Sequence, residues 1–318
     1  MTAPSSSESD SIAVAESVAK AHFNVQIVSC RLHDEQGAYS KTFVVELEDQ
    51  SKAVVQFRES PLNLSLYELA YQKLGNLVPK IEEKKSADIS LHQHVYIMNY
   101  IDGEMWNSAL GAWPGAWEDD AAVAGQLGEA LSRCIVGPDS SEAVESYIIP
   151  RLQTVLNENI PSDRPELRKS VEELLESAHN LNKLPLSLSH VDLNATNMLI
   201  AKRGPPQLIG ILDWDLSRYL PFGIDAAQIR YMAVINRDRV DYPTEPSSTM
   251  VATSFWKALT ANLDFDLREY VVDAMKVGVI IYLEFPEGCG EREKREIQNA
   301  EKRLQWFDDV FRPLCSLR

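Results

Sequence analysis

The feature that most restricts the fold is a change of character near Gly103. Before it lie three short stretches rich in Val, Ile and Phe, at residues 24–31, 41–48 and 53–57, with turn-like residues between them. Such runs predict an antiparallel meander. After it, apolar residues recur at helical spacing over residues 119–134, 147–157 and 166–182. The chain therefore predicts a small sheet-rich part followed by a larger helical part.

The length also favours two parts, because 318 residues exceed what one hydrophobic core usually organises. We predict a disordered tail over residues 1–10, which are rich in Ser and acidic residues, an N-terminal lobe over 11–100 and a C-terminal lobe over 101–318. Helical spacing over 11–22 and 61–74 and a further strand at 92–101 complete the first lobe. A cleft between two lobes is a usual place for a small-molecule site.

The charge balance restricts the partners. Lys and Arg total 31 against 47 Asp and Glu, a formal net charge of −16. Such a chain repels phosphate backbones and anionic lipid, so we expect a small-molecule substrate, no nucleic acid and no membrane partner. A cationic or neutral ligand fits this charge, although solvation alone accounts for most surface carboxylates. The sequence leaves the oligomeric state open.

The cysteines and the N-terminal residues indicate the cellular compartment of the protein. The four cysteines are far apart, which favours free thiols in a reducing compartment. The Ser-rich, acidic start lacks the basic and apolar regions of a signal peptide, and no apolar run approaches the ~20 residues of a membrane span. We therefore expect a cytoplasmic protein.

A polar loop and a hairpin near residue 200 carry the chemistry. Residues 198–202 and 207–212 form two strands around a turn, so their outer ends return to the same place. Asn197 and Asp213 can meet there, and their oxygens suit Mg²⁺ that keeps waters and binds nucleotide phosphates. Asp192, on the same loop, is offset so that it can face a substrate hydroxyl and accept its proton.

These residues carry a family resemblance. His190-x-Asp192, Asn197 and the later Asp213-Trp214-Asp215 resemble the signature of aminoglycoside phosphotransferases, which choline kinases and many fungal relatives share. The segment ending at Asp225 is similar to a structural aspartate motif of that family. The resemblance implies an α+β, bilobal protein-kinase-like fold with a small antiparallel-sheet N-lobe and a larger helical C-lobe.

The resemblance also implies roles in the C-terminal lobe. Asp192 would be the catalytic aspartate, and His190 would support its loop through hydrogen bonds. Asn197 and Asp213 would bind magnesium, and Asp215 would be a further metal or water contact. ATP and Mg²⁺ are the cofactors that the family implies.

The nucleotide residues match less well. Backbone groups of Asn99, Tyr100 and Ile101 would hold the adenine. The strand position that usually carries Lys or Arg is Gln56; either Arg58, on the same strand face, takes over the phosphate contact, or this contact is missing. Losing such a cation typically removes ~3 kcal/mol of transition-state stabilisation.

Two more positions have open interpretations. Either Glu68 pairs with the cation of the strand, or it is a solvated glutamate on the helix. Loop 35–40 has a single glycine, Gly37, so either Ser40 contacts phosphate or the loop is a plain hairpin turn.

The leading hypothesis is an ATP- and Mg-dependent phosphotransferase acting on a hydroxyl of a small molecule, with an amine-bearing acceptor as one interpretation of the acidic charge. One alternative is a kinase-fold protein that has lost phosphoryl transfer and binds a metabolite. Another is a different reaction that uses Asp192 as a base without nucleotide. The acceptor and the choice between ATP and GTP stay open.

Overall fold

The computed structural model describes residues 6–34, 36–37, 39–84, 94–106, 117–237, 240–243, 247–283 and 291–316. The chain divides into two compact units, Met1–Asp102 and Gly103–Arg318.

The first unit is built on a five-stranded antiparallel sheet of order β1-β2-β3-β5-β4. Its strands are β1 (Ile27–Leu32), β2 (Ser40–Leu47), β3 (Lys52–Arg58), β4 (Ile81–Lys84) and β5 (His94–Asn99). Helices α1 (Ser6–Phe23) and α2 (Leu64–Leu74) and the short turn η1 (Gly75–Leu77) complete it. The predicted meander is confirmed, whereas β4 is four residues long and gave no periodic signal in the sequence.

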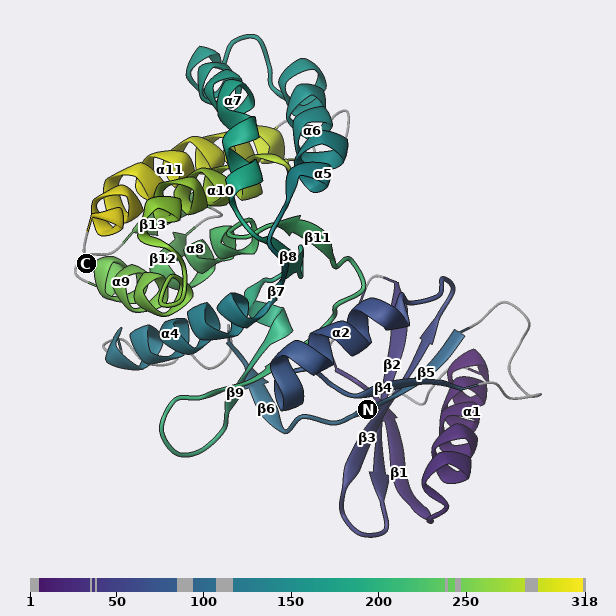
Figure 1. Ribbon diagram of the computed structural model, residues 1–318. Coiled ribbons are helices and arrows are strands. Elements are labelled where there is room, and N and C mark those ends of the chain that lie inside the picture. Colours follow the sequence, from purple (N-terminus) through teal and green to yellow (C-terminus); the bar gives the residue numbers. More distant parts are fainter. Residues whose placement is uncertain are drawn as a thin grey trace. The chain divides into compact units, whose positions relative to one another are not determined.

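The core of this unit follows from the alternation of β3. Val55 and Phe57 face α1 together with Phe43, and the Phe43 and Phe57 rings meet edge to face at 5.6 Å. Figure 1 shows α1 beside this sheet. Gln56 points to the opposite face, with Thr42 and Tyr96 as its cross-strand neighbours. Alternation therefore puts apolar side chains under α1, whereas the other face carries polar residues such as Gln56 together with apolar ones such as Val44 and Val54.

Two predicted boundaries in this unit differ from the structure. Helix α1 begins at Ser6, so residues 6–10 are helical and do not belong to a disordered tail. Acidic residues and serines are favoured near a helix N-terminus, where they suit its dipole and its unpaired N–H groups, so the same composition is compatible with a helix start. Strand β1 begins at Ile27 and not at residue 24, because Asn24 turns the chain with a φ of 54°.

The second unit contains most of the helices and two three-stranded sheets, of order β10-β9-β6 and β11-β8-β7. Its strands are β6 (Gly103–Met105), β7 (Ile135–Gly137), β8 (Leu186–Ser189), β9 (Met198–Ala201), β10 (Leu208–Ile211) and β11 (Arg218–Pro221), followed by the hairpin of β12 (Val234–Arg237) and β13 (Val240–Pro243). Strands β9 and β10 were predicted, over 198–202 and 207–212. Strands β6 and β7 were missed because they have only three residues, and β11 was missed because its sequence, Arg-Tyr-Leu-Pro, lacks the run of apolar residues that marks β9 and β10.

The helices of this unit surround these sheets (Figure 1). They are α4 (Trp117–Arg133), α5 (Ser141–Ala143), η2 (Val144–Ile148), α6 (Ile149–Thr154), η3 (Val155–Asn159), α7 (Pro165–Ser177), η4 (Ala178–Lys183), η5 (Ala195–Asn197), η6 (Asp225–Ile229), α8 (Arg230–Ala233), α9 (Ser247–Leu259), η7 (Phe265–Leu267), α10 (Arg268–Ile280) and α11 (Glu291–Cys315). The helices predicted over 119–134, 147–157 and 166–182 all form. A Cβ at Gly128 would collide with the Phe255 carbonyl, so glycine allows α4 and α9 to approach closely.

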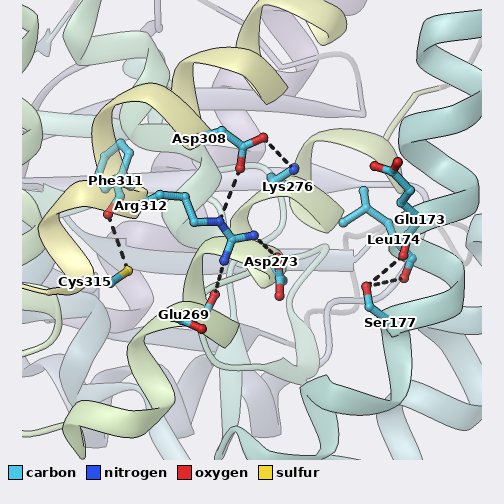
Figure 2. A network of polar contacts seen from close by, with 10 residues as sticks. All are labelled: Glu173, Leu174, Ser177, Glu269, Asp273, Lys276, Asp308, Phe311, Arg312 and Cys315. Carbon is cyan, nitrogen blue, oxygen red and sulfur yellow. Dashed lines mark hydrogen bonds and ion pairs between the residues drawn. The ribbon is translucent and has the colours of Figure 1, made fainter.

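One polar network joins the last two helices. Figure 2 shows the Arg312 guanidinium of α11 between Asp273 and the Glu269 carbonyl of α10 and Asp308 of its own helix. Lys276 of α10 adds a 2.8 Å ion pair to Asp308. Burial disfavours the charged guanidinium, but Asp273 and Asp308 outweigh it and raise the pKa of Arg312. The network therefore holds α10 and α11 together.

In the part of the chain that the structure describes, no helix has both the length and the apolar character needed to span a bilayer. Cys30, Cys134 and Cys315 are free thiols.

Candidate active site

The loop after β8 is anchored by a buried carboxylate from a distant segment. Asp225, at the start of η6, accepts hydrogen bonds from the backbone N–H groups of His190 and Val191, the latter at 3.1 Å. These bonds hold Val191 at a φ of 75°, which a β-branched residue adopts only when its surroundings enforce it. Burial raises the pKa of Asp225 to about 6, although the two backbone hydrogen bonds act in the opposite direction.

Asp225 also lines a small cavity, of about 10 Å³, together with Ser187 and Ser189 of β8. This volume is near the minimum that holds one water molecule. The polar lining suits such a water.

His190 connects the loop to the hairpin. Its side chain is fully buried, its Nε2 lies 2.6 Å from the Leu212 carbonyl oxygen, and its ring meets Trp214 edge to face at 4.7 Å. Burial lowers the pKa of His190, so the imidazole is neutral near pH 7 and Nε2 carries the proton that the carbonyl accepts. This position gives His190 a supporting geometry rather than access to a substrate.

The hairpin places Asn197 next to Leu212, the residue before Asp213. Met198 pairs with Ile211, and the Leu212 N–H donates to the Asn197 carbonyl oxygen at 2.8 Å. Leu212 is therefore bonded through its N–H to Asn197 and through its carbonyl to His190. Its backbone fixes the point from which Asp213 projects.

Asp213 itself is exposed, and it has a φ of 66°, a left-handed conformation that Asp tolerates better than most residues. The next residue, Trp214, is buried and donates from Nε1 to the Ile211 carbonyl at 3.0 Å. Asp215 follows and is half-buried. The Trp214 anchor thus sets the positions of the two flanking aspartates.

The exposed Asp192 carboxylate is positioned by two asparagines. Asn194 donates from Nδ2 to Asp192 Oδ1 at 3.0 Å, and its own Oδ1 accepts from the Thr196 N–H at 2.9 Å. Asn197 donates from Nδ2 to the Asp192 carbonyl at 2.8 Å. Since its nitrogen is used in this way, the Oδ1 of Asn197 is the end that can face a cation.

Asn194 is a residue that the sequence reasoning missed. Its signal was present in the sequence, because an Asn directly before a short helical turn is a common N-cap.

The donor set fits a loosely held hard cation. Among the described residues, no group of three or more His, Cys, Asp or Glu side chains is gathered to hold a metal. Mg²⁺ does not need such a group, since it usually keeps several waters and takes one or two carboxylates plus substrate phosphates. The Asn197 amide oxygen and the Asp213 carboxylate are ligands of this kind.

The predicted phosphate residues lie in the first unit. Gln56 donates from Nε2 toward Ser40 Oγ at 3.2 Å and Thr42 Oγ1 at 3.3 Å, so Ser40 and Gln56 are brought together. Arg58 shares the face of Gln56, and only 8% of it is exposed. Glu68 is exposed and accepts a 3.0 Å hydrogen bond from Gln72 Nε2. Positions 35 and 38 of the predicted phosphate loop lie outside the described residues.

The predicted hinge residues follow β5. The Asn99 N–H already donates to the Lys80 carbonyl at 3.2 Å, so this donor is used within the sheet. Tyr100 is half-buried, and Lys52 Nζ lies 5.5 Å from its ring centroid. Ile101 is also half-buried, which leaves Tyr100 and Ile101 as the hinge residues to test.

A comparison with models of known protein families identifies the family of this chain. Residues 34–244, two thirds of the chain, match the model of the family described as the phosphotransferase enzyme family, and the chain belongs to this family. The resemblance inferred from the motifs is therefore confirmed, and the protein is a phosphotransferase enzyme. Comparison with the curated proteins finds no match.

Solved structures agree on the fold. A macrolide 2′-phosphotransferase type I superposes with a TM-score of 0.61 at 13% identity, over 96% of this chain and 99% of that one. An amicoumacin kinase in complex with AMP-PNP and Ca²⁺ gives 0.56 at 16%, over 98% and 100%. A Plasmodium vivax ethanolamine kinase gives 0.54 at 15%, over 90% and 84%. The predicted α+β, protein-kinase-like fold is confirmed.

Proposed function

We propose that this phosphotransferase uses ATP and Mg²⁺ to phosphorylate a hydroxyl of a small molecule in the cytoplasm. The observation that carries the proposal is the double hydrogen bonding of Leu212, through its N–H to Asn197 and through its carbonyl to His190. This pair of bonds ties the Asp192 loop to the backbone that precedes Asp213. Three polar residues from two segments thereby become one preorganised group, which is the main requirement of phosphoryl transfer.

In this reaction Asp192 is the general base. Its carboxylate accepts the proton of the acceptor hydroxyl as the hydroxyl oxygen attacks the terminal phosphorus and the bond to the ADP oxygen breaks. Asn194 binds Asp192 Oδ1 at 3.0 Å, whereas Asn197 Nδ2 lies 3.5 Å from Oδ2, so Oδ2 is the less tightly bonded oxygen and is assigned as the proton acceptor. His190 and Asp225 act through the backbone and touch no reacting atom.

Asn197 and Asp213, with Asp215 nearby, would hold the metal, which when bound neutralises charge on the phosphates. Tyr100 and Ile101 are the proposed adenine contacts. Arg58 is the cation two residues from Gln56 on the same face of β3, and we assign it the phosphate contact. Because Gln56 is neutral and bonded to β2, we expect slower turnover than a lysine at this position would give.

The test compares Asp192→Asn and Asp213→Asn with wild type in an ADP-release assay. The panel contains amino alcohols, aminoglycosides and hydroxy acids, with Mg–ATP. We expect Asp192→Asn to lower kcat by about 10²–10⁴-fold with an unchanged melting temperature, because the side chain is exposed. Asp213→Asn removes turnover and also the stabilisation by Mg–ADP.

Asp163→Asn is the matched control, since Asp163 is an exposed carboxylate in a turn of the same unit. Full turnover by Asp192→Asn would contradict the assigned base. A wild-type protein that releases no ADP and is not stabilised by Mg–ATP would overturn the proposed reaction.

A second function has one observation in its favour. Gln56 is a neutral amide and therefore offers no charge to a triphosphate, and its Nε2 is already bonded to Ser40 and Thr42. This favours a member of the family that binds a metabolite without transferring phosphate. Stabilisation by a metabolite of the panel, but not by Mg–ATP, would support it. A reaction that needs Asp192 but not nucleotide would survive Asp213→Asn.

A further inference from the structure

A group of arginines and tyrosines lies beside the base of the Asp192 loop. Arg218 begins β11 and pairs with Ser189, the residue before His190. Its guanidinium stacks over the ring of Tyr147 in η2, at 4.6 Å from the ring centroid. Stacking of this kind orients the planar guanidinium and leaves its edge N–H groups directed away from the ring.

Tyr282, just after α10, lies near this group, because its chain neighbour Ile281 is bonded to Arg151, four residues after Tyr147. Arg151 of α6 donates from Nε to the carbonyl of the preceding residue, Ile281, at 2.7 Å. Burial, then the nearby Asp225 and Tyr147, raises the pKa of the Tyr282 hydroxyl, while Arg218 and Arg151 act in the opposite direction. The hydroxyl is therefore a neutral donor at physiological pH.

Two hydrogen-bond donors of this group are buried and have no hydrogen-bond partner among the described residues. Among the residues that the structure describes, neither the Tyr282 hydroxyl nor Arg218 Nε has a hydrogen-bond partner, and both atoms are buried. An unsatisfied buried donor costs about 1–3 kcal/mol, so two in one place call for a bound group that accepts both. Asp225 is not that group, because neither donor is hydrogen-bonded to it; its two oxygens accept from the N–H groups of His190 and Val191.

We propose that Arg218 and Tyr282 form an anion subsite for the acceptor, which holds a carboxylate or phosphate group of the alcohol to be phosphorylated. A guanidinium edge and a phenol hydroxyl are a complementary donor set for such an oxyanion. Tyr147 is a positioning residue that orients Arg218. This inference rests on the proposed function, and it gives an acceptor opposite in charge to the amine that the net charge of −16 suggests.

The first experiment measures binding without nucleotide. Inorganic phosphate is titrated calorimetrically into wild type, Arg218→Gln, Tyr282→Phe and Arg203→Gln. Arg203 is an exposed arginine in the turn between β9 and β10, so its variant controls for the loss of one positive charge. We expect Kd to rise at least tenfold in Arg218→Gln, about threefold in Tyr282→Phe and not at all in Arg203→Gln.

Equal effects of Arg218→Gln and Arg203→Gln, or no phosphate binding by wild type, would overturn the subsite. If Arg218→Gln does not fold, Tyr282→Phe decides, because it removes only one hydroxyl oxygen. If the Kd for Mg–ADP rises in Arg218→Gln together with the Kd for phosphate, the site binds a phosphate of the nucleotide. This result would also overturn the acceptor subsite.

The second experiment compares turnover on matched alcohols, D-glycerate and glycerol. The subsite predicts a higher kcat/KM for D-glycerate and a loss of this preference in Tyr282→Phe, mainly through KM. Equal kcat/KM for the two alcohols would contradict it. Phosphate binding that depends on Arg218 in a protein that turns over no acceptor would overturn the proposed reaction but leave the anion site.

Discussion

Two buried carboxylates of this protein, those of Asp225 and Asp120, differ in the hydrogen bonds that they accept. Asp225 accepts two backbone hydrogen bonds and fixes the loop before Asp192. Asp120, in the first turn of α4, is only 9% exposed, and among the described residues its Oδ1 has no hydrogen-bond partner. Burial, reinforced by Asp119, raises the pKa of Asp120 from 3.8 to about 6.

The pKa of Asp120 leads to a prediction about stability. Because the folded state binds this proton more tightly than the unfolded chain, the free energy of unfolding falls as pH rises from about 4 to about 6. A shift of this size corresponds to roughly 3 kcal/mol. Since the amide of Asp120→Asn remains a buried polar group, we expect the variant to be about 1–3 kcal/mol more stable than wild type near pH 7.5 and equal to it near pH 4.

Urea unfolding of both proteins at these two pH values measures the difference. Asp163→Asn is the control, because that carboxylate is exposed and lies outside α4, so its removal changes stability by less than about 0.5 kcal/mol. A gain that is the same at both pH values would refute the role of ionisation.

At the scale of elements, the longest helix depends on one arginine. Arg312 of α11 contacts Asp273 and the Glu269 carbonyl of α10 and also Asp308 (Figure 2). The side chains of Arg312 and Asp273 are only 33% and 21% exposed, so removing the guanidinium leaves a partly buried carboxylate without its main partner. Such losses cost more than the original pair contributes.

We expect Arg312→Ala to lower the free energy of unfolding by about 2–4 kcal/mol, as measured by urea denaturation. Lys169→Ala is the matched control, because the Lys169–Glu173 pair of α7 is 71% and 63% exposed. Its loss costs at most about 0.5 kcal/mol. Equal effects of the two variants would show that the α10–α11 network adds nothing to stability.

At the scale of the whole molecule, the net charge of −16 opposes compaction. Because salt screens this repulsion, raising NaCl from about 20 mM to about 300 mM is expected to raise the melting temperature by a few degrees. Differential scanning fluorimetry measures the shift, and KCl in place of NaCl separates screening from binding of a particular cation. A melting temperature that falls with salt would mean that attractive ion pairs outweigh the repulsion.

The division of the chain into a sheet-rich and a helical part was readable from the sequence, because hydrophobic periodicity and turn residues are local signals. The same holds for the hairpin that places Asn197 beside Leu212 and Asp213. Asp192 and its neighbour Asn194 also lie within one loop of eight residues, 190–197, so their proximity is a local feature of the sequence. Strands β6, β7 and β11 were not predicted, since they lack the apolar run that marks β9 and β10.

Tertiary structure alone decided how this loop is held and what surrounds it. Asp225 binds the His190 N–H from 35 residues away, and the neutral, buried state of His190 depends on packing against Trp214. The pairing of Gln56 with Ser40 and Thr42 and the stacking of Arg218 on Tyr147 likewise join separate segments. Contacts of this kind depend on which faces the folded elements present to one another, and local spacing along a chain contains no record of that choice.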